Sequence, residues 1–206
     1  MVVGGIVLPH PPIILSRFAG DRGAEVQGTI EAVRRACRWL ASDLRPDRLV
    51  IASPHVGHGF DVPLAFLQEA LGELPAADRL LTLDPYERYA ELGKELRAKE
   101  ASVRTRTAIV ASGDCSHRLR PGGPYGFHEA GPALDRAIQA GLRSGRAEEL
   151  LAVDRDLVER GSECGLRSFV FALAAVQPTQ VDVLSYECPY GVGYLVATLV
   201  SGAQEG

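Results

Sequence analysis

The sequence predicts an α/β fold: a single-domain, three-layer sandwich in which helices cover both faces of a mostly parallel, mixed central sheet. Three observations predict this fold. Short apolar runs alternate along the chain with longer segments whose apolar residues recur at helical spacing. The last two apolar runs are separated only by ECPYG at residues 187–191, which indicates an antiparallel hairpin. The length of 206 residues suits one domain.

The expected elements alternate in chain order. Strands are predicted at residues 2–9, 48–53, 79–83, 107–112, 181–186 and 192–200. Helices are predicted at about residues 23–42, 63–71, 86–99, 129–143, 146–159 and 165–176. The buried face of the first helix is predicted from its periodic apolar residues, Val26, Ile30, Val33, Cys37 and Leu40. Residues 113–128 are expected to form a long loop and residues 201–206 a frayed tail within the single domain 1–206.

The composition excludes several classes of protein. Hydrophobic residues make up 46% of the chain and charged residues 23%, which is typical of globular domains. The formal net charge is −4 and no block of Lys or Arg occurs, so neither nucleic acid nor an anionic membrane is an expected partner. Apolar stretches are interrupted well before the ~18 residues that a membrane span requires.

The beginning of the chain and its cysteines predict a cytoplasmic location. Residues 1–7 enter a strand directly and carry no basic region or cleavage motif of a signal peptide. The 4 cysteines are widely spaced and form no C-x-x-C pair. This spacing favours reduced thiols over disulfides or a structural zinc site.

Candidate functional residues follow the ends of the predicted strands. All 5 histidines lie directly after an apolar strand or in the loop that continues from it: His10, His55, His58, His117 and His128. Glu187 follows the strand at 181–186 in the same manner. In open α/β sheets, ligands bind outside the carboxyl ends of the strands. The sequence therefore predicts one functional site at that edge of the sheet.

Three of these residues form a candidate metal-binding set. His10, held between prolines, His55 and Glu187 supply two imidazoles and one carboxylate. That set is the facial triad of non-haem Fe(II) oxygenases, and it equally suits a catalytic zinc. His58 is a further ligand candidate or a neighbour that supports one. Taken singly, each residue has a plainer reading, a loop histidine bonded to a carbonyl or an exposed turn acid.

The loop at 113–128 carries the other candidates. His117 has hydroxyl and carboxylate neighbours, and an imidazole with a pKa near 6.5 suits general acid–base catalysis beside a metal. A fourth ligand or a capping group are the alternatives. Asp114 either orients His117 or stabilises the turn. Tyr125, Phe127 and His128 are predicted to wall a pocket for a planar ring, unless the loop is a surface Ω-loop with the aromatic side chains packed on the core. Cys164 is read as the start of a helix, without reactivity.

The motifs now carry a family resemblance. They are, in order, LPHPP at 8–12, SPHVGHG at 53–59, SGDCSHRL at 112–119 with PGGPYGFH at 121–128, and SYECPYGVGY at 185–194. Together they resemble the catalytic B-subunit superfamily of class III extradiol ring-cleavage dioxygenases, which includes the protocatechuate 4,5-dioxygenase beta chain. Within it, the chain is most similar to the small B-subunit-like proteins that stand alone or are fused to an AMMECR1-type domain and are related to Memo proteins.

This resemblance implies a function. It implies a three-layer α/β fold and a non-haem Fe(II) dioxygenase that cleaves a catecholic ring with O₂, with His10, His55 and Glu187 as iron ligands and His117 as acid–base catalyst. The chain departs from established ring cleavers in being shorter and in having no histidine between His58 and His117. It also lacks a recognisable partner-subunit segment that would close the pocket.

Two other functions stay open at this point. One is a zinc-dependent hydrolase on the same ligands, with His117 assisting a metal-bound water. The other is a Memo-like, non-enzymatic metal-binding or accessory protein that works with an AMMECR1-type or radical-SAM partner. A homo-dimer formed through an exposed strand edge is also left open.

Overall fold

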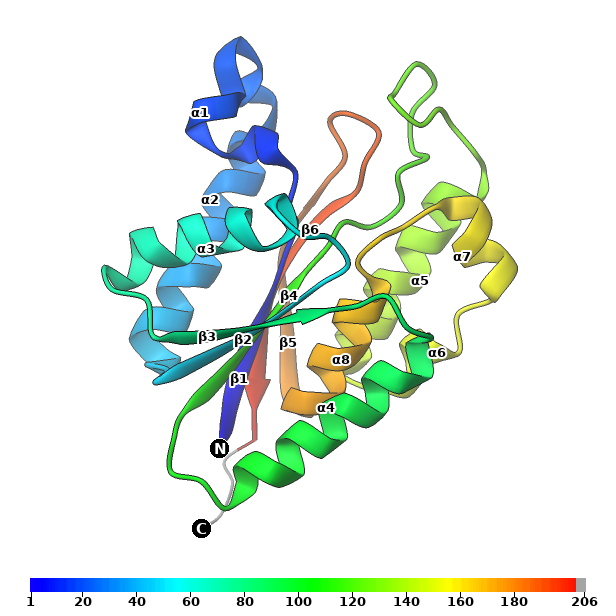
Figure 1. Ribbon diagram of the computed structural model, residues 1–206. Coiled ribbons are helices and arrows are strands. Elements are labelled where there is room, and N and C mark those ends of the chain that lie inside the picture. The colour runs from blue at the N-terminus through cyan, green and yellow to red at the C-terminus, as the bar shows by residue number, and fades with distance from the viewer. Residues whose placement is uncertain (203–206) are drawn as a thin grey trace.

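The computed structural model describes residues 1–202, and these contain one six-stranded sheet with the order β3-β2-β4-β1-β6-β5 (Figure 1). The strands are β1 (Val2–Leu8), β2 (Arg48–Ser53), β3 (Ala76–Leu81), β4 (Thr107–Ser112), β5 (Pro178–Glu187) and β6 (Tyr194–Ser201). Strands β1 to β4 pair in parallel, whereas β6 runs antiparallel to both of its neighbours, β1 and β5. The predicted mixed, mostly parallel sheet and its terminal hairpin are confirmed.

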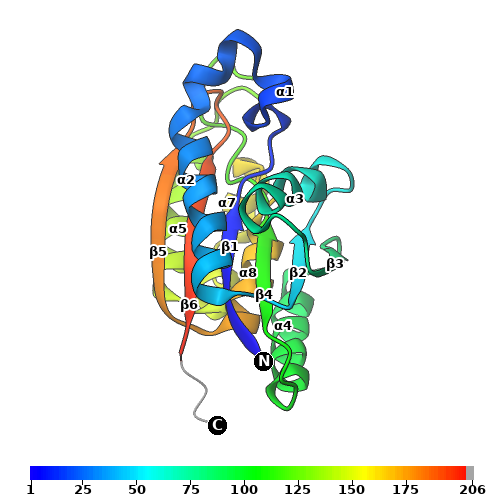
Figure 2. The same cartoon turned by 90° about the vertical axis from the view of Figure 1, so that its left-hand side faces the viewer.

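Helices cover both faces of this sheet, which gives the predicted three layers (Figure 2). One face packs against α2 (Gln27–Trp39) and α3 (His58–Leu71), and the other against α4 (Tyr86–Ala101), α5 (Ala130–Ser144) and α8 (Leu166–Val176). Strand β1 contributes side chains to both hydrophobic cores, because successive side chains of a strand point to opposite faces of the sheet. Ile6 and Leu8 belong to the core under α2 and α3, and Val7 belongs to the other core.

Short helical elements complete the chain and modify the sequence-based prediction. They are η1 (Pro12–Ile14), α1 (Ser16–Ala19), η2 (Gly20–Val26), a π-helical turn η3 (Leu40–Leu44), α6 (Ala147–Leu151) and α7 (Arg155–Gly161). The helix predicted at 146–159 is thus two helices, because the Asp154 side chain accepts the backbone N–H groups of Asp156 and Leu157 and starts a new one. Ser201 belongs to β6 and is not frayed, and residues 203–206 lie outside the described residues.

Among the described helices, none combines the length and the apolar character needed to span a bilayer.

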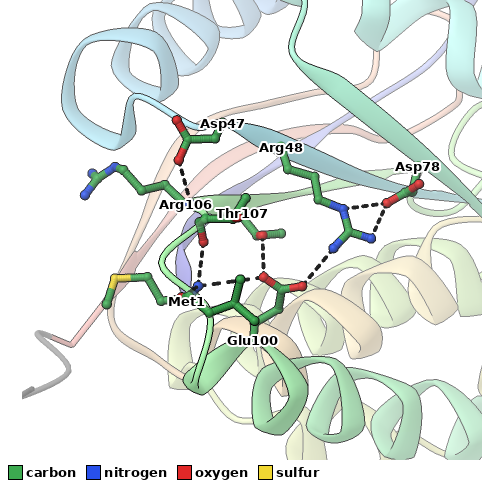
Figure 3. Close-up of polar contacts among 9 residues, drawn as sticks. Met1, Asp47, Arg48, Asp78, Glu100, Arg106 and Thr107 are labelled. Carbon is green, nitrogen blue, oxygen red and sulfur yellow. Dashed lines mark hydrogen bonds and ion pairs between the residues drawn. The ribbon is translucent and has the colours of Figure 1, made fainter.

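A buried carboxylate ties the amino ends of the parallel strands to helix α4 (Figure 3). Glu100 is 2% exposed and accepts hydrogen bonds from Arg48 Nη1 at 2.8 Å and from Thr107 Oγ1 at 2.8 Å. The α-amino group of Met1 lies 3.7 Å from the same carboxylate, and Arg48 also pairs with Asp78 on β3. A buried carboxylate is stable only when donors surround it, and here they come from β2, β4 and the start of the chain.

We expect Glu100→Ala to destabilise the protein by about 2–4 kcal/mol, since Arg48 and Thr107 would lose their acceptor. Urea unfolding followed by circular dichroism measures this. The matched control is Glu91→Ala on the same helix, because Glu91 forms an exposed ion pair with Arg88 and should leave the free energy of unfolding near wild type. Equal losses in the two variants would contradict the role of the buried carboxylate.

Candidate metal centre and active site

The carboxyl ends of β1, β2 and β4 meet at a cavity of about 260 Å³. Its lining includes four histidines, together with Asp114, Cys164 and Tyr125, and is otherwise made of proline, tyrosine and valine side chains. The four are His10, His55, His58 and His117. The predicted gathering of strand-end histidines at one edge of the sheet is therefore what the structure shows for these four.

Three imidazole rings form a triangle in this cavity. The ring centroid of His10 lies 5.2 Å from that of His55 and 5.2 Å from that of His58, and the last two are 5.3 Å apart. His10 follows β1, while the other two follow β2. The Ser53 hydroxyl accepts the backbone N–H of His55 at 3.2 Å and thereby holds the turn that presents it.

A hydrogen-bond chain fixes the tautomer of His10. The Ser112 hydroxyl donates its only proton to the carbonyl of Gly59 at 2.6 Å, so the 3.0 Å contact between Ser112 Oγ and His10 Nδ1 has Nδ1–H as the donor. Nε2 therefore carries the ring's lone pair, and it lies 3.5 Å from the Cys164 sulfur. Burial, and then the neighbouring His55, His58 and His117, lower the pKa of His10 to about 3. The ring is neutral at physiological pH, which is the form that binds metals.

Cys164 is a site residue that the sequence-based reading missed. It precedes α8, which begins at the carboxyl edge of the sheet, and its thiol accepts the Asp114 N–H at 3.3 Å. Two glycines allow this approach, because a Cβ on Gly113 would lie 2.2 Å from the Cα of Gly165. Burial raises the pKa of the thiol well above its usual value, and the sulfur lies 3.5 Å from His10 Nε2 and 3.9 Å from the carbonyl oxygen of Asp114. Helices that connect parallel strands start at the carboxyl edge of the sheet. The position of Cys164 just before such a helix was therefore the sequence signal that could have placed it in the site.

His117 lies in the same cavity beneath an aromatic ring. Its imidazole stacks on Tyr125, with ring centroids 4.9 Å apart, and its backbone N–H donates to the carbonyl of Ser162 at 2.8 Å. Burial, and then His55, lower its pKa to about 4. Tyr125 is 58% exposed, and it also lines the cavity.

Asp114 links two of the loops. Its Oδ1 accepts the backbone N–H of His10 at 3.1 Å, so it holds the loop after β1 next to the loop after β4. Burial raises the pKa of this carboxyl to about 7. Within the described residues, two groups place their ligand atoms within 4.8 Å of one another: His10 with His55 and Cys164, and Asp114 with His117 and Cys164. The two groups share the thiol.

Glu187 is not brought to this cluster, and the expectation that it completes a His/His/Glu set needs correction. Its carboxylate lies against α2, where Oε2 accepts the Thr29 hydroxyl proton at 2.5 Å. A Cβ on Gly28 would lie 2.3 Å from Glu187 Oε1, so the helix has room for the carboxylate. The strand-end acid is thus satisfied by a hydroxyl, and it belongs to neither metal-capable group of the described residues.

His128 also lies apart from the cavity. Its Nδ1 accepts the backbone N–H of Ala130 at 3.0 Å, at the beginning of α5. Neither His128 nor Phe127 is among the lining residues of the cavity, whereas Tyr125 is.

This open α/β sheet carries imidazole, thiol and carboxyl groups at its carboxyl edge. The chain therefore belongs to the class of α/β proteins that have a metal-capable site at the strand ends. Comparison with known families narrows this class. Residues 56–197, more than half of the chain, match the family described as the catalytic LigB subunit of aromatic ring-opening dioxygenase. The chain therefore belongs to this family, as its motifs predicted. His10 and His55 precede the matched segment.

Individual relatives add the following. Protein CA_C1420 of Clostridium acetobutylicum is 33% identical over 150 residues, which cover 71% of this chain and 32% of that protein. The chain thus spans about a third of the length of this curated relative. The uncharacterized protein JW3007 of Escherichia coli K12 has a similar structure, with a TM-score of 0.61 and 12% identity over 96% of this chain and 99% of its own. At that identity the likeness concerns the fold alone.

We expect the rings of His10 and His117 to stay neutral when the metal-free protein is brought from pH 7 to pH 5. A lowered pKa means that protonation needs a more acidic solution than for a peptide histidine, whose pKa is ~6.5. Two-dimensional ¹⁵N NMR of the imidazole nitrogens measures it. His10 should show a protonated Nδ1 throughout, and a titration midpoint near 6.5 for either ring would contradict the expectation.

Proposed function

We propose that this chain binds a divalent metal ion through His10, His55 and Cys164 and uses it in extradiol-type opening of a catecholic ring with O₂. The observation that carries the proposal is the Nε2 lone pair of a buried, neutral His10, grouped with His55 and Cys164 in a cavity that His117 also lines. Membership in a family of aromatic ring-opening dioxygenases supports the reaction class.

The donor set fits a transition metal. Imidazole nitrogens suit iron, zinc and copper, and the ligand atoms of the three residues lie within 4.8 Å of one another. His10 already donates its other ring N–H to Ser112, the arrangement that orients metal-binding histidines. We propose Fe(II), which when bound would hold the two substrate oxygens and supply the redox chemistry that O₂ requires.

The remaining steps depend on the chain itself. His117, neutral because of its lowered pKa, would take a hydroxyl proton from the substrate and later return it. The cavity of about 260 Å³ is slightly below the ~300–1,000 Å³ of typical small-molecule sites, so it suits a substrate with one ring. Tyr125 and the neighbouring prolines would flank that ring and exclude water.

A zinc-dependent hydrolase is the second candidate, and one observation favours it. Cys164 stands in the donor set where the predicted set had a carboxylate, and thiolate ligands suit zinc. Expression with equal iron and zinc, followed by metal analysis and assays under air and under argon, separates the two functions, since only the oxygenase needs O₂. Catechol turnover that continues under argon would exclude the dioxygenase.

A non-enzymatic role is the remaining alternative. The chain matches about a third of CA_C1420. We therefore also propose a separate or fused partner of the AMMECR1 or radical-SAM type. A fully iron-loaded protein that opens no catechol of a broad panel would favour the non-enzymatic role.

We also propose the cytosol as the compartment, because all 4 cysteines are free thiols and Cys188 is exposed.

We expect Cys164→Ser to lose most of the bound metal and Glu187→Gln to keep it. The thiol belongs to the donor group, whereas the Glu187 carboxylate is bonded to Thr29 beside α2. Metal stoichiometry after anaerobic Fe(II) or Zn(II) reconstitution and desalting measures the difference. The opposite result, with metal lost in Glu187→Gln and kept in Cys164→Ser, would restore the His/His/Glu set.

We expect His117→Ala to lower kcat by ~10²–10⁴-fold while the metal content stays near wild type, because His117 moves a proton and the other group holds the metal. The assay is anaerobic Fe(II) reconstitution, addition of a catechol, and admission of air while the yellow ring-fission product is recorded. Loss of metal together with activity would show that His117 is a ligand instead.

A further inference from the structure

We infer that Asp135 and Tyr186 form a positioning pair that holds the backbone on which His117 stands. As far as catalysis is concerned, the inference rests on the proposed function. Neither residue lines the cavity, and the proposed reaction assigns them no direct part.

Asp135 connects three elements through its two carboxylate oxygens. It stands on α5, where it is 1% exposed. Its Oδ1 accepts the backbone N–H of Ser116 at 2.6 Å, and its Oδ2 accepts the hydroxyl proton of Tyr186, on β5, at 2.5 Å. Burial raises the pKa of Asp135 to about 6, so at neutral pH the ionised form accepts both bonds. Short bonds to an ionised acceptor are the strong ones.

The segment that Asp135 holds is bonded on all sides. The Ser116 carbonyl accepts the N–H of Gly193 at 2.8 Å, and the Cys115 N–H donates to the Gly193 carbonyl at 2.8 Å. The Ser116 hydroxyl donates to the Gly161 carbonyl at 2.6 Å. The next residue is His117, so the bonds to the Ser116 peptide groups fix the backbone position from which the His117 side chain extends.

The β5–β6 hairpin is shaped around this carboxylate. A Cβ on Gly193 would lie 2.3 Å from Asp135 Oδ2 and 2.9 Å from the Cβ of Cys115, so only glycine allows the approach. The hairpin, α5 and the loop after β4 therefore meet at one ionised group. Removing it would leave the N–H of Ser116 without its acceptor in a buried place, and the loop would shift to find another.

A buried acid can also act only on stability, so the test needs a control of that kind. Glu100 provides it, because it is a carboxylate of equal burial, 2% exposed, with Arg48 and Thr107 as donors. It lies at the amino ends of the strands (Figure 3), whereas the cavity lies at their carboxyl ends. Glu100→Ala should reduce stability without moving His117.

The experiment compares Asp135→Ala, Asp135→Asn, Tyr186→Phe and Glu100→Ala in the full chain. We expect Asp135→Ala to lower kcat by ~10–100-fold with a nearly unchanged KM, which is the effect of a misplaced catalytic group. Asp135→Asn should restore most of kcat, since its amide can accept from Ser116 and donate to the Tyr186 oxygen. Tyr186→Phe removes only the hydrogen bond from the Tyr186 hydroxyl to Asp135, so it should give a smaller loss of kcat. This variant serves as the test if Asp135→Ala does not fold.

A second readout needs no turnover. In the metal-free protein, the ¹⁵N resonances of the His117 ring should move in Asp135→Ala and stay in place in Glu100→Ala, while those of His10 change little in both. Unchanged His117 resonances in folded Asp135→Ala or Tyr186→Phe, or equal changes in Glu100→Ala, would overturn the inference. A wild-type protein inactive on every catechol, with His117 resonances that still respond to Asp135, would reject the proposed reaction and keep the positioning role.

Discussion

The common register of three parallel strands is the constraint on which the site depends. Leu8 of β1 lies opposite Ser112 of β4, and Ala52 of β2 lies opposite Ala111, so the three strands end at one level. His10, His55 and Asp114 each stand two residues beyond the last residue of their strand. A shift of one residue in either pairing would turn the side chains of that strand to the other face and displace the loop group that follows it. Backbone pairing thus sets the geometry of the cavity before any side chain contributes.

Burial then gives the collected groups their chemistry. Desolvation is the largest cause of the lowered pKa values of His10 and His117 and of the raised values of Asp114 and Cys164. The same apolar edge therefore favours the neutral forms of the imidazoles, of the Asp114 carboxyl and of the Cys164 thiol. Neutral imidazoles keep the ring lone pairs that a metal ion would bind, so the burial that sets these pKa values also suits the side chains to the proposed metal.

Much of the fold, and part of the site, could be predicted from the sequence. Strand order along the chain, the helix-covered mixed sheet and the positions of His10, His55 and His117 follow from periodicity and from the strand-end rule. Glu187 was misplaced because that rule gives the edge at which a residue lies, and not the direction of its side chain; here Thr29 on α2 satisfies the carboxylate. Cys164 was missed because its place depends on a close contact between Gly113 and Gly165, which join segments far apart in the chain.

The exchange of a carboxylate for a thiol has a consequence for the choice of metal. A carboxylate is ionised near neutral pH without help, whereas the Cys164 thiol, with its raised pKa, must release its proton when a cation arrives. The metal affinity of the proposed centre should therefore depend on pH more steeply than that of a His/His/carboxylate centre. Softer ions, which bind thiolate strongly, gain most from the exchange. In the proposed centre, this one donor would decide how far iron is favoured over zinc.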